Sequence, residues 1–532
     1  MRFKLFRLIS FLIPPFISAL LLVLSFPTFD IGWLAWVGLA PLLVALAGRS
    51  SAYGFFSFFI YGFLFFTGVC SWLYEVDTFR VVHHMIIMTY LGLYFGFFGL
   101  TFNFISKRWG ATAAHLAAPF IWVSIEYIRS NMSFLALPWG LLAHTQHQHP
   151  LVIQISSITG AYGLSFFLLM VNSTLAAVTL LFLAQSKMRI KLPGYKFPSP
   201  RGVLSMVLAT GVLAGLILLQ GHIALARPLT GQKLKLSILQ GNIEQEKKWN
   251  PQYSDYIMQT YTDLSMKAAK DQPDLIVWPE AATPRYVLRN NALLKQIQTV
   301  IAKANTSFLI GSAEYSKSLT KKPSNRVRIG NTALFFSSAG KVLGTYLKIR
   351  LVPFGEYVPY PGVIPWPDFI AVGGNSSWDL PGKEYTTFEL NGDKFGAVIC
   401  WESIFPGLFR KFVKDGAGFM INITNEGWFR RKIPHQYVAM NVFRAAENRV
   451  FLARAANTGV SCFIDPYGRI VGRVEKDGQD TYVRGYLTRE ITIAKQRTFY
   501  TEYGDVFVSL CLLVSCLIVI SSFFRPGKSH SA

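Results

Sequence analysis

The chain has 532 residues, of which 52% are hydrophobic and 15% are charged, and its mean hydropathy is +0.34. This composition is too apolar for an ordinary soluble protein. The formal net charge of +23 would suit a nucleic-acid-binding protein, but no aromatic-interleaved basic patch, zinc spacing or phosphate loop accompanies it. Topogenic loops and contact with anionic headgroups explain much of this charge more simply.

Apolar blocks recur along the chain, each close to the roughly 20 residues that cross a bilayer core. They lie at residues 9–26, 31–48, 54–73, 84–105, 111–128, 161–184, 203–223 and 504–523. The sequence therefore predicts a polytopic α-helical membrane region of about eight spans. Asn172 in the sixth block is expected to bond a neighbouring helix. Glu126 and Arg129, near the outer end of the fifth block, are expected to pair with each other or to reach the membrane interface.

Lysine and arginine are concentrated in every second loop between these blocks. The residues are Arg2, Lys4, Arg7, Arg49, Lys107, Arg108, Lys187, Arg189, Lys191, Lys196, Arg201, Arg525 and Lys528. Because short basic loops stay on the cytoplasmic side, the segment between the last two spans is expected outside the cytoplasm. The predicted domains are a seven-span region at 1–225, a periplasmic catalytic domain at 226–503, and an eighth span with a short cytoplasmic tail at 504–532.

Beyond about residue 233, short β-branched or aromatic runs alternate with amphipathic stretches, which is typical of an α/β domain. Strands are predicted at 234–239, 275–278, 308–311, 332–337, 397–400, 419–423 and 460–464. Helices are predicted at 253–270, 292–304 and 434–449.

Three residues at predicted strand ends form a chemical combination. Glu280 ends LIVWPE (275–280), Lys348 lies in GTYLKIRLVPFGE (344–356), and Cys400 ends AVIC (397–400). A cysteine is nucleophilic only as the thiolate, so Cys400 needs a base, and Glu280 can serve if apolar surroundings raise its pKa. Lys348 and the N–H of Trp401 would stabilise an oxyanion. Each residue alone would more often be structural, but together they predict an acyl-transfer enzyme.

Other residues are candidates for supporting roles. Glu356 would orient Lys348 or an amine substrate, and Glu402 would play a similar part behind Cys400. The candidate substrate contacts are Trp139, Trp249, Asn425 and Trp428, although tryptophans are more often core or interface residues. The five cysteines have no pair spacing, and no His/Cys/Asp cluster has metal-ligand spacing. We therefore expect neither a disulfide framework nor a metal or other cofactor.

Ordered motifs over residues 234–490 resemble the nitrilase, or carbon–nitrogen hydrolase, superfamily. They are WPE with Glu280, YLK with Lys348, VICWE with Cys400, RAAENR (444–449), ANTGVS (456–461) and IDPYG (464–468). With the spans and the strings QGNI (240–243) and LVPFGEYVP (351–359), the chain resembles the membrane-embedded acyltransferases of this superfamily. The resemblance implies an αββα sandwich with a Glu280, Lys348 and Cys400 triad, supported by Trp249, Glu356 and Glu402.

The resemblance also implies a ping-pong reaction in a bacterial cytoplasmic (inner) membrane. Cys400 would take an acyl chain from the sn-1 position of a phospholipid and release a lysophospholipid. The α-amine of the diacylglyceryl-cysteine of an apolipoprotein would then attack the thioester. This chain departs from the family pattern at Trp401, which is often tyrosine, and at Arg350, which is often histidine.

Two other functions share these features. A membrane-anchored amidase or nitrilase would form the same thioester and discharge it to water, hydrolysing a small C–N substrate. A membrane scaffold that kept only the fold is the third hypothesis, and it would be attractive if any of Glu280, Lys348 and Cys400 were replaced. None of the three is replaced.

Overall fold

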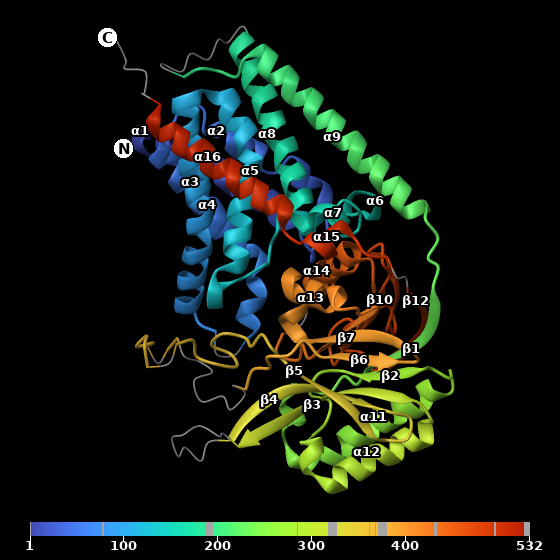
Figure 1. The fold of residues 1–532 in the computed structure, drawn as a ribbon. Coiled ribbons are helices and arrows are strands. Elements are labelled where there is room, and N and C mark those ends of the chain that lie inside the picture. The colour runs from blue at the N-terminus through green and yellow to red at the C-terminus, as the bar shows by residue number, and fades with distance from the viewer. Residues whose placement is uncertain are drawn as a thin grey trace. The chain divides into compact units, whose positions relative to one another are not determined.

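The computed structural model describes residues 2–76, 79–186, 195–284, 286–317, 327–360, 362–367, 369–370, 380–429, 433–493 and 496–525. The chain forms two compact units, Met1–Ala226 with Tyr503–Ala532, and Arg227–Glu502. The first unit is helical and the second contains all of the strands that the structure describes (Figure 1).

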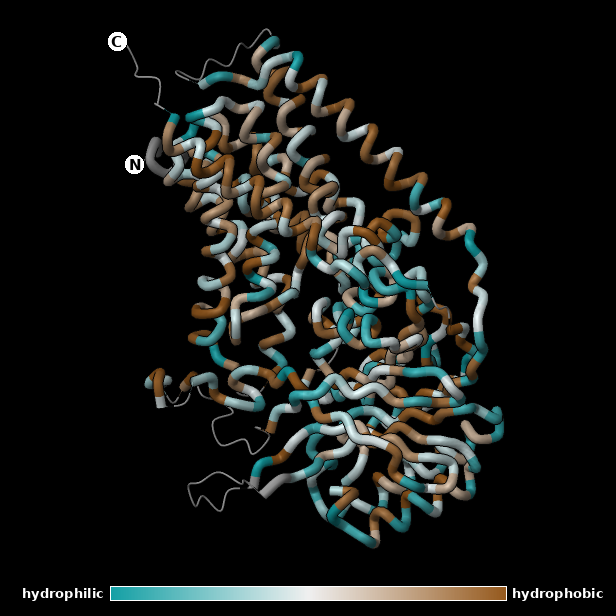
Figure 2. The backbone as a smooth tube through the Cα atoms, viewed as in Figure 1, coloured by the Kyte–Doolittle hydropathy of each residue, from teal (hydrophilic) through white to brown (hydrophobic). Residues whose placement is uncertain are grey.

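The helical unit is dominated by long helices. Its elements are α1 (Arg2–Ser25), η1 (Gly32–Trp36), α2 (Ala40–Ala45), α3 (Ser51–Val69), η2 (Ser71–Glu75), α4 (Val81–Trp109), α5 (Ala111–Asn131), η3 (Ser133–Leu135), η4 (Leu142–Gln146), α6 (Pro150–Ile153), α7 (Ser156–Thr159), α8 (Ala161–Gln185), α9 (Pro200–Ala226) and α16 (Val506–Phe524). Among the described residues, six helices are long and apolar enough to cross a membrane, namely α1, α3, α4, α8, α9 and α16. Apolar residues run along α9 in Figure 2. The predicted polytopic helical region is confirmed.

Two predicted spans differ from this pattern. Block 111–128 forms α5, which at 21 residues is about 31 Å long, but its buried Glu126 and Arg129 make it less apolar. Block 31–48 forms only the short helices η1 and α2. The continuous spanning helix that its apolarity predicts is not formed there, because the helix is interrupted between Trp36 and Ala40 and begins again with Pro41 in its first turn.

Asn172 of α8 satisfies the backbone of this interrupted segment. Its Oδ1 accepts hydrogen bonds from the N–H groups of Leu39 and Ala40, at 2.8 and 3.1 Å, and its Nδ2 donates to the carbonyl of Ala35 at 2.9 Å. Irregular backbone at membrane depth is tolerated only where protein supplies such partners. The predicted role of Asn172 in bonding a neighbouring element is confirmed.

Glu126 and Arg129 of α5 both hold the loop that follows this helix. Arg129 Nη1 donates to the carbonyls of Leu137 and Trp139, at 2.7 and 2.6 Å. Glu126 Oε1 accepts from the N–H of Leu142 at 2.9 Å. The Arg129 cation thus binds carbonyl oxygens of the loop, and the Glu126 carboxylate binds one of its N–H groups. Together the two side chains fix the loop that carries Trp139.

The second unit contains two six-stranded sheets. Its elements are β1 (Gln232–Gln240), α10 (Gln245–Lys248), η5 (Pro251–Tyr253), α11 (Ser254–Ala269), β2 (Leu275–Trp278), η6 (Val287–Arg289), α12 (Asn291–Ala304), β3 (Ser307–Lys317), β4 (Val327–Phe336), β5 (Val342–Leu347), β6 (Thr387–Leu390), β7 (Asp393–Ile399), η7 (Cys400–Ile404), α13 (Pro406–Lys414), β8 (Phe419–Thr424), α14 (Ile433–Asn448), β9 (Phe451–Ala456), β10 (Cys462–Ile464), β11 (Ile470–Arg473), β12 (Gly485–Ile493) and α15 (Phe499–Tyr503). The strand orders are β12-β1-β2-β3-β4-β5 and β11-β10-β9-β8-β7-β6.

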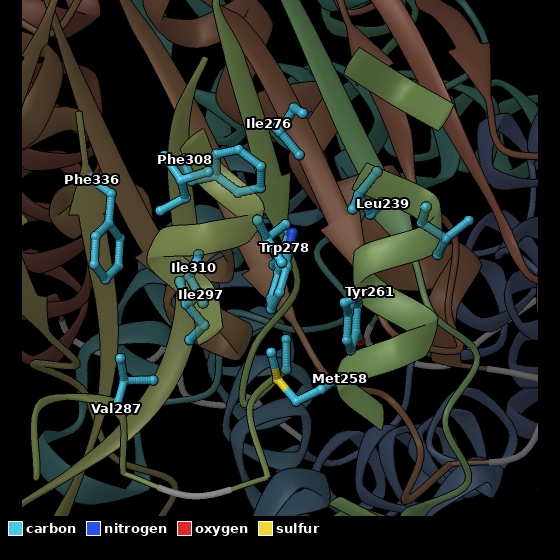
Figure 3. Close-up of a cluster of buried hydrophobic side chains, with 14 of the residues drawn as sticks. Leu239, Met258, Tyr261, Ile276, Trp278, Val287, Ile297, Phe308, Ile310 and Phe336 are labelled. Carbon is cyan, nitrogen blue, oxygen red and sulfur yellow. The ribbon is translucent and has the colours of Figure 1, made fainter. Parts of the chain in front are cut away.

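The two sheets form the middle layers of an αββα sandwich. Strand β1 lies against β9 and β4 against β7, while α11 contacts the first sheet and α13 and α14 the second. On the first sheet, Trp278 of β2 is fully buried and stacks on Tyr261, with the ring centres 4.9 Å apart (Figure 3). Its indole N–H donates to the Ser265 hydroxyl at 3.0 Å. The end of β2 is therefore anchored. The predicted αββα fold is confirmed.

Candidate active site

Glu280, Lys348 and Cys400 follow the ends of three strands. Glu280 comes two residues after β2, Lys348 directly after β5, and Cys400 directly after β7. Strands β2 and β5 belong to one sheet and β7 to the other, so the sandwich brings the three residues together from both inner layers. Lys348 Nζ lies 3.8 Å from Glu280 Oε1, and both groups act electrostatically on the Cys400 thiol. The predicted combination of residues is a single cluster.

Glu280 is held on both carboxylate oxygens. Its side chain is 8% exposed, Oε1 accepts from the side-chain amide of Asn331, and Oε2 accepts from the N–H of Asn425 at 2.6 Å. Burial raises the pKa of Glu280, and Glu356 adds to the rise, while Lys348 and the Asn425 N–H oppose it. A carboxyl with a raised pKa holds a proton more readily, which suits a group that takes a proton and returns it.

Lys348 is a fixed cation. It is fully buried, its Nζ donates to Glu356 Oε1 at 2.7 Å, and Glu280 Oε1 lies 3.8 Å from the same nitrogen. Glu356 is itself anchored, since its Oε2 accepts from the N–H of Val352 at 2.7 Å. Burial opposes the charge on Lys348, but Glu356, Cys400 and Glu280 outweigh burial and raise the pKa of this ammonium. Glu356 thus contacts Lys348 directly, as its expected role in orienting this lysine requires.

Cys400 is the first residue of η7 and follows β7 directly, where the chain turns sharply. Its φ is +57°, in the left-handed region that residues other than glycine rarely adopt. Asn422 Nδ2 donates to the carbonyl of Cys400 at 3.2 Å and holds the turn in place. Burial raises the pKa of the Cys400 thiol, Glu280 raises it further, and Lys348 opposes the rise. A thiol with a raised pKa rests in the protonated form, so it can act as a nucleophile only where a base accepts its proton.

Glu402 connects the nucleophile turn to the segment after β5. It is fully buried, and its two oxygens accept from the Tyr346 hydroxyl and from the N–H groups of Ile349, Arg350 and Ile399, all between 2.7 and 2.9 Å. Burial raises the pKa of Glu402 to about 7 against these hydrogen bonds. Glu402 thus fixes the backbone beside Lys348 relative to the backbone before Cys400 and does not itself need to contact a substrate.

The two residues that depart from the family pattern contact each other. The Trp401 indole N–H donates to the Arg350 carbonyl at 2.5 Å, and the Arg350 guanidinium lies 4.0 Å from the centre of the Phe405 ring. Burial lowers the pKa of Arg350, although Tyr357 and other neighbours oppose the shift. These contacts link the segment after β5 to the residues that directly follow Cys400.

The candidate substrate contacts lie in different environments. Trp249 and Trp428 are 41% and 56% exposed, so their rings are accessible to a ligand. Asn425 is 8% exposed and serves Glu280 through its N–H. Trp139 belongs to the helical unit, where it is 3% exposed and packs against Trp72 at 5.3 Å. Their roles in substrate binding stay predictions.

Two comparisons with family models cover most of the chain. Residues 18–174 match the apolipoprotein N-acyltransferase N-terminal domain, and residues 235–496 match the carbon–nitrogen hydrolase domain. The apolipoprotein N-acyltransferase of Geobacter metallireducens is 33% identical over 523 residues, covering 97% of this chain and 95% of that protein. The one from Chlorobaculum tepidum is 28% identical, covering 96% of each chain. The chain belongs to the apolipoprotein N-acyltransferase family.

Among solved structures, a mutant amidase of the nitrilase superfamily from Nesterenkonia AN1 aligns with 51% of this chain and 94% of its own, with 16% identity and a TM-score of 0.38.

Three residues of the candidate site were not predicted from the sequence. Asn331 of β4 binds the Glu280 carboxylate, Tyr346 of β5 binds Glu402, and Lys248 of α10 donates to the main-chain carbonyl of Glu280 at 3.0 Å. The first two lie in strands and the third in a charged run, where nothing local distinguishes a buried polar side chain from an exposed one. A buried asparagine or tyrosine implies a partner only once burial is known.

Gly311 of β3 supports Glu280 by leaving room for it. A Cβ at this position would lie 2.1 Å from the Pro279 carbonyl oxygen and 2.7 Å from Glu280 Cα. Both neighbours are backbone atoms, so Gly311→Ala is expected to displace Glu280, and a displacement of about 1 Å can cost about 100-fold in rate. Gly407→Ala is the matched control, since nothing lies within 4 Å of its added Cβ. Acyl-transfer assays of both variants should show a large loss only for Gly311→Ala, and equal activities would contradict this role.

Proposed function

We propose that this chain transfers an acyl chain from a phospholipid to the α-amino group of the N-terminal diacylglyceryl-cysteine of apolipoproteins. The observation that carries the proposal is the convergence of Glu280, Lys348 and Cys400 in a chain that also has membrane-length helices. A soluble amidase needs no such helices. Both substrates proposed here reside in the membrane, one as a phospholipid and the other as a protein with a diacylglyceryl anchor. An active site held at the bilayer surface raises their effective concentration.

The first half-reaction acylates the enzyme. Cys400 Sγ attacks the carbonyl carbon of the sn-1 ester while Glu280 accepts the thiol proton. Lys348 and the N–H of Trp401, in the first turn of η7, stabilise the oxyanion of the tetrahedral intermediate. The C–O bond then breaks, and the departing lysophospholipid oxygen takes the proton from Glu280. The enzyme is left as a Cys400 thioester.

The second half-reaction transfers the acyl chain. The neutral α-amine of the diacylglyceryl-cysteine attacks the thioester carbonyl, and Glu280 accepts the amine proton. The C–S bond breaks, the Cys400 sulfur regains the proton from Glu280, and the N-acylated lipoprotein leaves. One carboxyl thus serves as base and then as acid in each half, which its raised pKa favours.

We place the catalytic unit on the periplasmic side of the bacterial inner membrane. Two helices, α9 and α16, join the catalytic unit to the helical unit. The start of α9 carries Lys196 and Arg201 and its end only Arg227, while Arg525 directly follows α16. In both helices the more basic flank is therefore the one farther along the chain from the catalytic unit. Basic flanks stay cytoplasmic, so the other ends of both helices open to the periplasm. The domain boundaries proposed are 1–225, 226–503 and 504–532.

Intact-mass measurement on the full-length protein tests this function. After incubation with phosphatidylethanolamine of defined chains, the protein should gain the mass of one sn-1 acyl chain, mapped to the peptide containing Cys400. A synthetic diacylglyceryl-cysteine peptide should remove this mass and become N-acylated. Hydrolysis of short amides with no adduct from phospholipid would overturn the proposal and favour the membrane-anchored amidase.

A further inference from the structure

Lys248 is a buried cation next to the catalytic carboxylate. The residue is 2% exposed and its Nζ donates to the main-chain carbonyl of Glu280 at 3.0 Å. Its neighbour Lys247 differs, since it is partly exposed and forms an ion pair with Glu244 at 2.9 Å. A buried ammonium is costly to desolvate, and a carbonyl oxygen offers it only a partial charge. The Glu280 carboxylate carries a full negative charge, which favours the charged form of Lys248.

The segment that carries Lys248 reaches Glu280 by a second route. Gln245, at the start of α10, accepts from the side-chain amide of Asn425 at 2.8 Å, and the N–H of Asn425 donates to Glu280 Oε2 at 2.6 Å. Asn457 links the start of this segment to Asn425, because its amide donates to both the Ile243 carbonyl and Asn425 Oδ1, at 2.7 and 3.0 Å. The segment therefore holds the main chain of Glu280 through Lys248 and its carboxylate through Asn425.

We propose that Lys248 is a positioning residue of the acyl-transfer site, which holds Glu280 in place and whose positive charge keeps the Glu280 carboxylate ready to accept the Cys400 proton. The proposal rests on the proposed function only in taking Glu280 as the base. Lys348 already faces the same carboxylate, but its ammonium is bound by Glu356. A second cation is therefore useful, because Lys348 alone must balance two carboxylates.

Several charges act on Glu280 besides Lys248. Burial and Glu356 disfavour its ionised form, whereas Lys348 and the N–H of Asn425 favour it. Glu426 also lies within electrostatic reach, although it is paired with Arg454, and Tyr437 faces the same cluster. These groups are common to the wild type and to a variant at position 248, so a difference between the two reports Lys248 alone.

The charge on Lys248 is itself pH-dependent. Burial lowers the pKa of Lys248 to about 7, while Glu280 opposes that shift. Below about pH 7 the cation is present and lowers the pKa of the coupled Glu280 and Cys400 pair. Above that pH the amine is neutral and the assistance ends. Removing Lys248 should therefore slow formation of the thiolate at low pH and have little effect at high pH.

Alkylation of Cys400 by iodoacetamide, followed by peptide mass spectrometry between pH 5 and 9, tests this inference in the full-length protein. Lys248→Met should react about tenfold more slowly than wild type near pH 5.5, since an adjacent charge shifts a pKa by about one unit or more. The two rates should converge by pH 9. Lys248→Arg, which keeps the charge, should restore the rate at low pH, and Lys247→Met should follow the wild type throughout.

Three results would overturn the role of Lys248. These are superimposable profiles for wild type and Lys248→Met, a deficit of the same size at every pH, which indicates disturbed structure, and failure of Lys248→Arg to restore the rate. The assay uses neither phospholipid nor lipoprotein. Failure of the proposed transferase activity would instead appear as a missing acyl adduct on the wild type, so the two failures are distinguishable.

Discussion

Cys400→Ala is expected to abolish both the acyl-enzyme adduct and acyl transfer, with a loss of at least about a thousandfold, because the covalent route disappears with its nucleophile. Cys400 follows β7 in a left-handed turn that presents its side chain to Glu280 and Lys348. We expect no neighbouring group to replace it, since the proposed mechanism uses Glu280 for proton transfer and Lys348 for charge stabilisation. Intact-mass and transfer assays measure the two losses separately.

Cys462→Ala is the matched control for this experiment. Cys462 is a fully buried thiol of β10 in the same unit, so its removal costs packing but no chemistry. It should keep the adduct and the transfer rate within a few-fold of the wild type. Cys400→Ser should lose nearly as much activity as Cys400→Ala, because a hydroxyl gives up its proton less readily than a thiol. An adduct that persists in Cys400→Ala would place the nucleophile elsewhere.

The local patterns that predicted strands best are continuous apolar runs between turn residues. The run LIVW was predicted as a strand at 275–278 and forms β2 with the same bounds, and the strand predicted at 419–423 forms β8, one residue longer. Both are central strands that are buried on both faces, so every residue must be apolar or paired. Strand β12 was missed. Its sequence breaks the strict polar–apolar alternation of an edge strand at Arg489–Glu490, and its partner β1 lies more than 240 residues away in the chain.

Apolarity alone misled the prediction for block 31–48. Hydropathy measures whether a segment tolerates lipid and says nothing of where its backbone hydrogen bonds go. Here they go partly to the side chain of Asn172, a residue 130 or more positions away in the chain. Asn172 in α8 and the interruption between η1 and α2 are thus parts of one structural feature. In the sequence they lie far apart, and nothing there connects them.

The proposed catalytic residues were predictable because each follows an apolar run and differs in chemistry from the residues around it. Their supporting partners were not. Two lysines stand side by side at 247 and 248, and only the fold decides that one is exposed and the other lies against Glu280. The left-handed conformation of Cys400 is equally hidden, because the residue was predicted to end a strand, whereas the structure ends β7 at Ile399.

Glu280→Gln is expected to lower the rate of enzyme acylation by about 10²- to 10⁴-fold, the range typical of a lost general base. The amide has nearly the same shape as the carboxylate, and Asn331 can accommodate it. The Asn331 amide donates to Glu280, and its Oδ1 has no hydrogen-bond partner among the described residues, so turning the amide over would present an acceptor to the new NH2 group. The unfolding midpoint of the full chain should therefore change little.

The same variant separates proton acceptance from electrostatic support. Glu280 raises the pKa of the Cys400 thiol, so its neutralisation should lower that pKa and move the iodoacetamide profile of Cys400 to lower pH. Acyl transfer should nevertheless collapse, because the departing lysophospholipid oxygen and the incoming amine still need a group that exchanges protons with them. A more reactive thiol in a less active enzyme is the combination that a proton-transfer role requires. A profile shifted to higher pH, or transfer within tenfold of the wild type, would show that Glu280 acts on Cys400 in some other way.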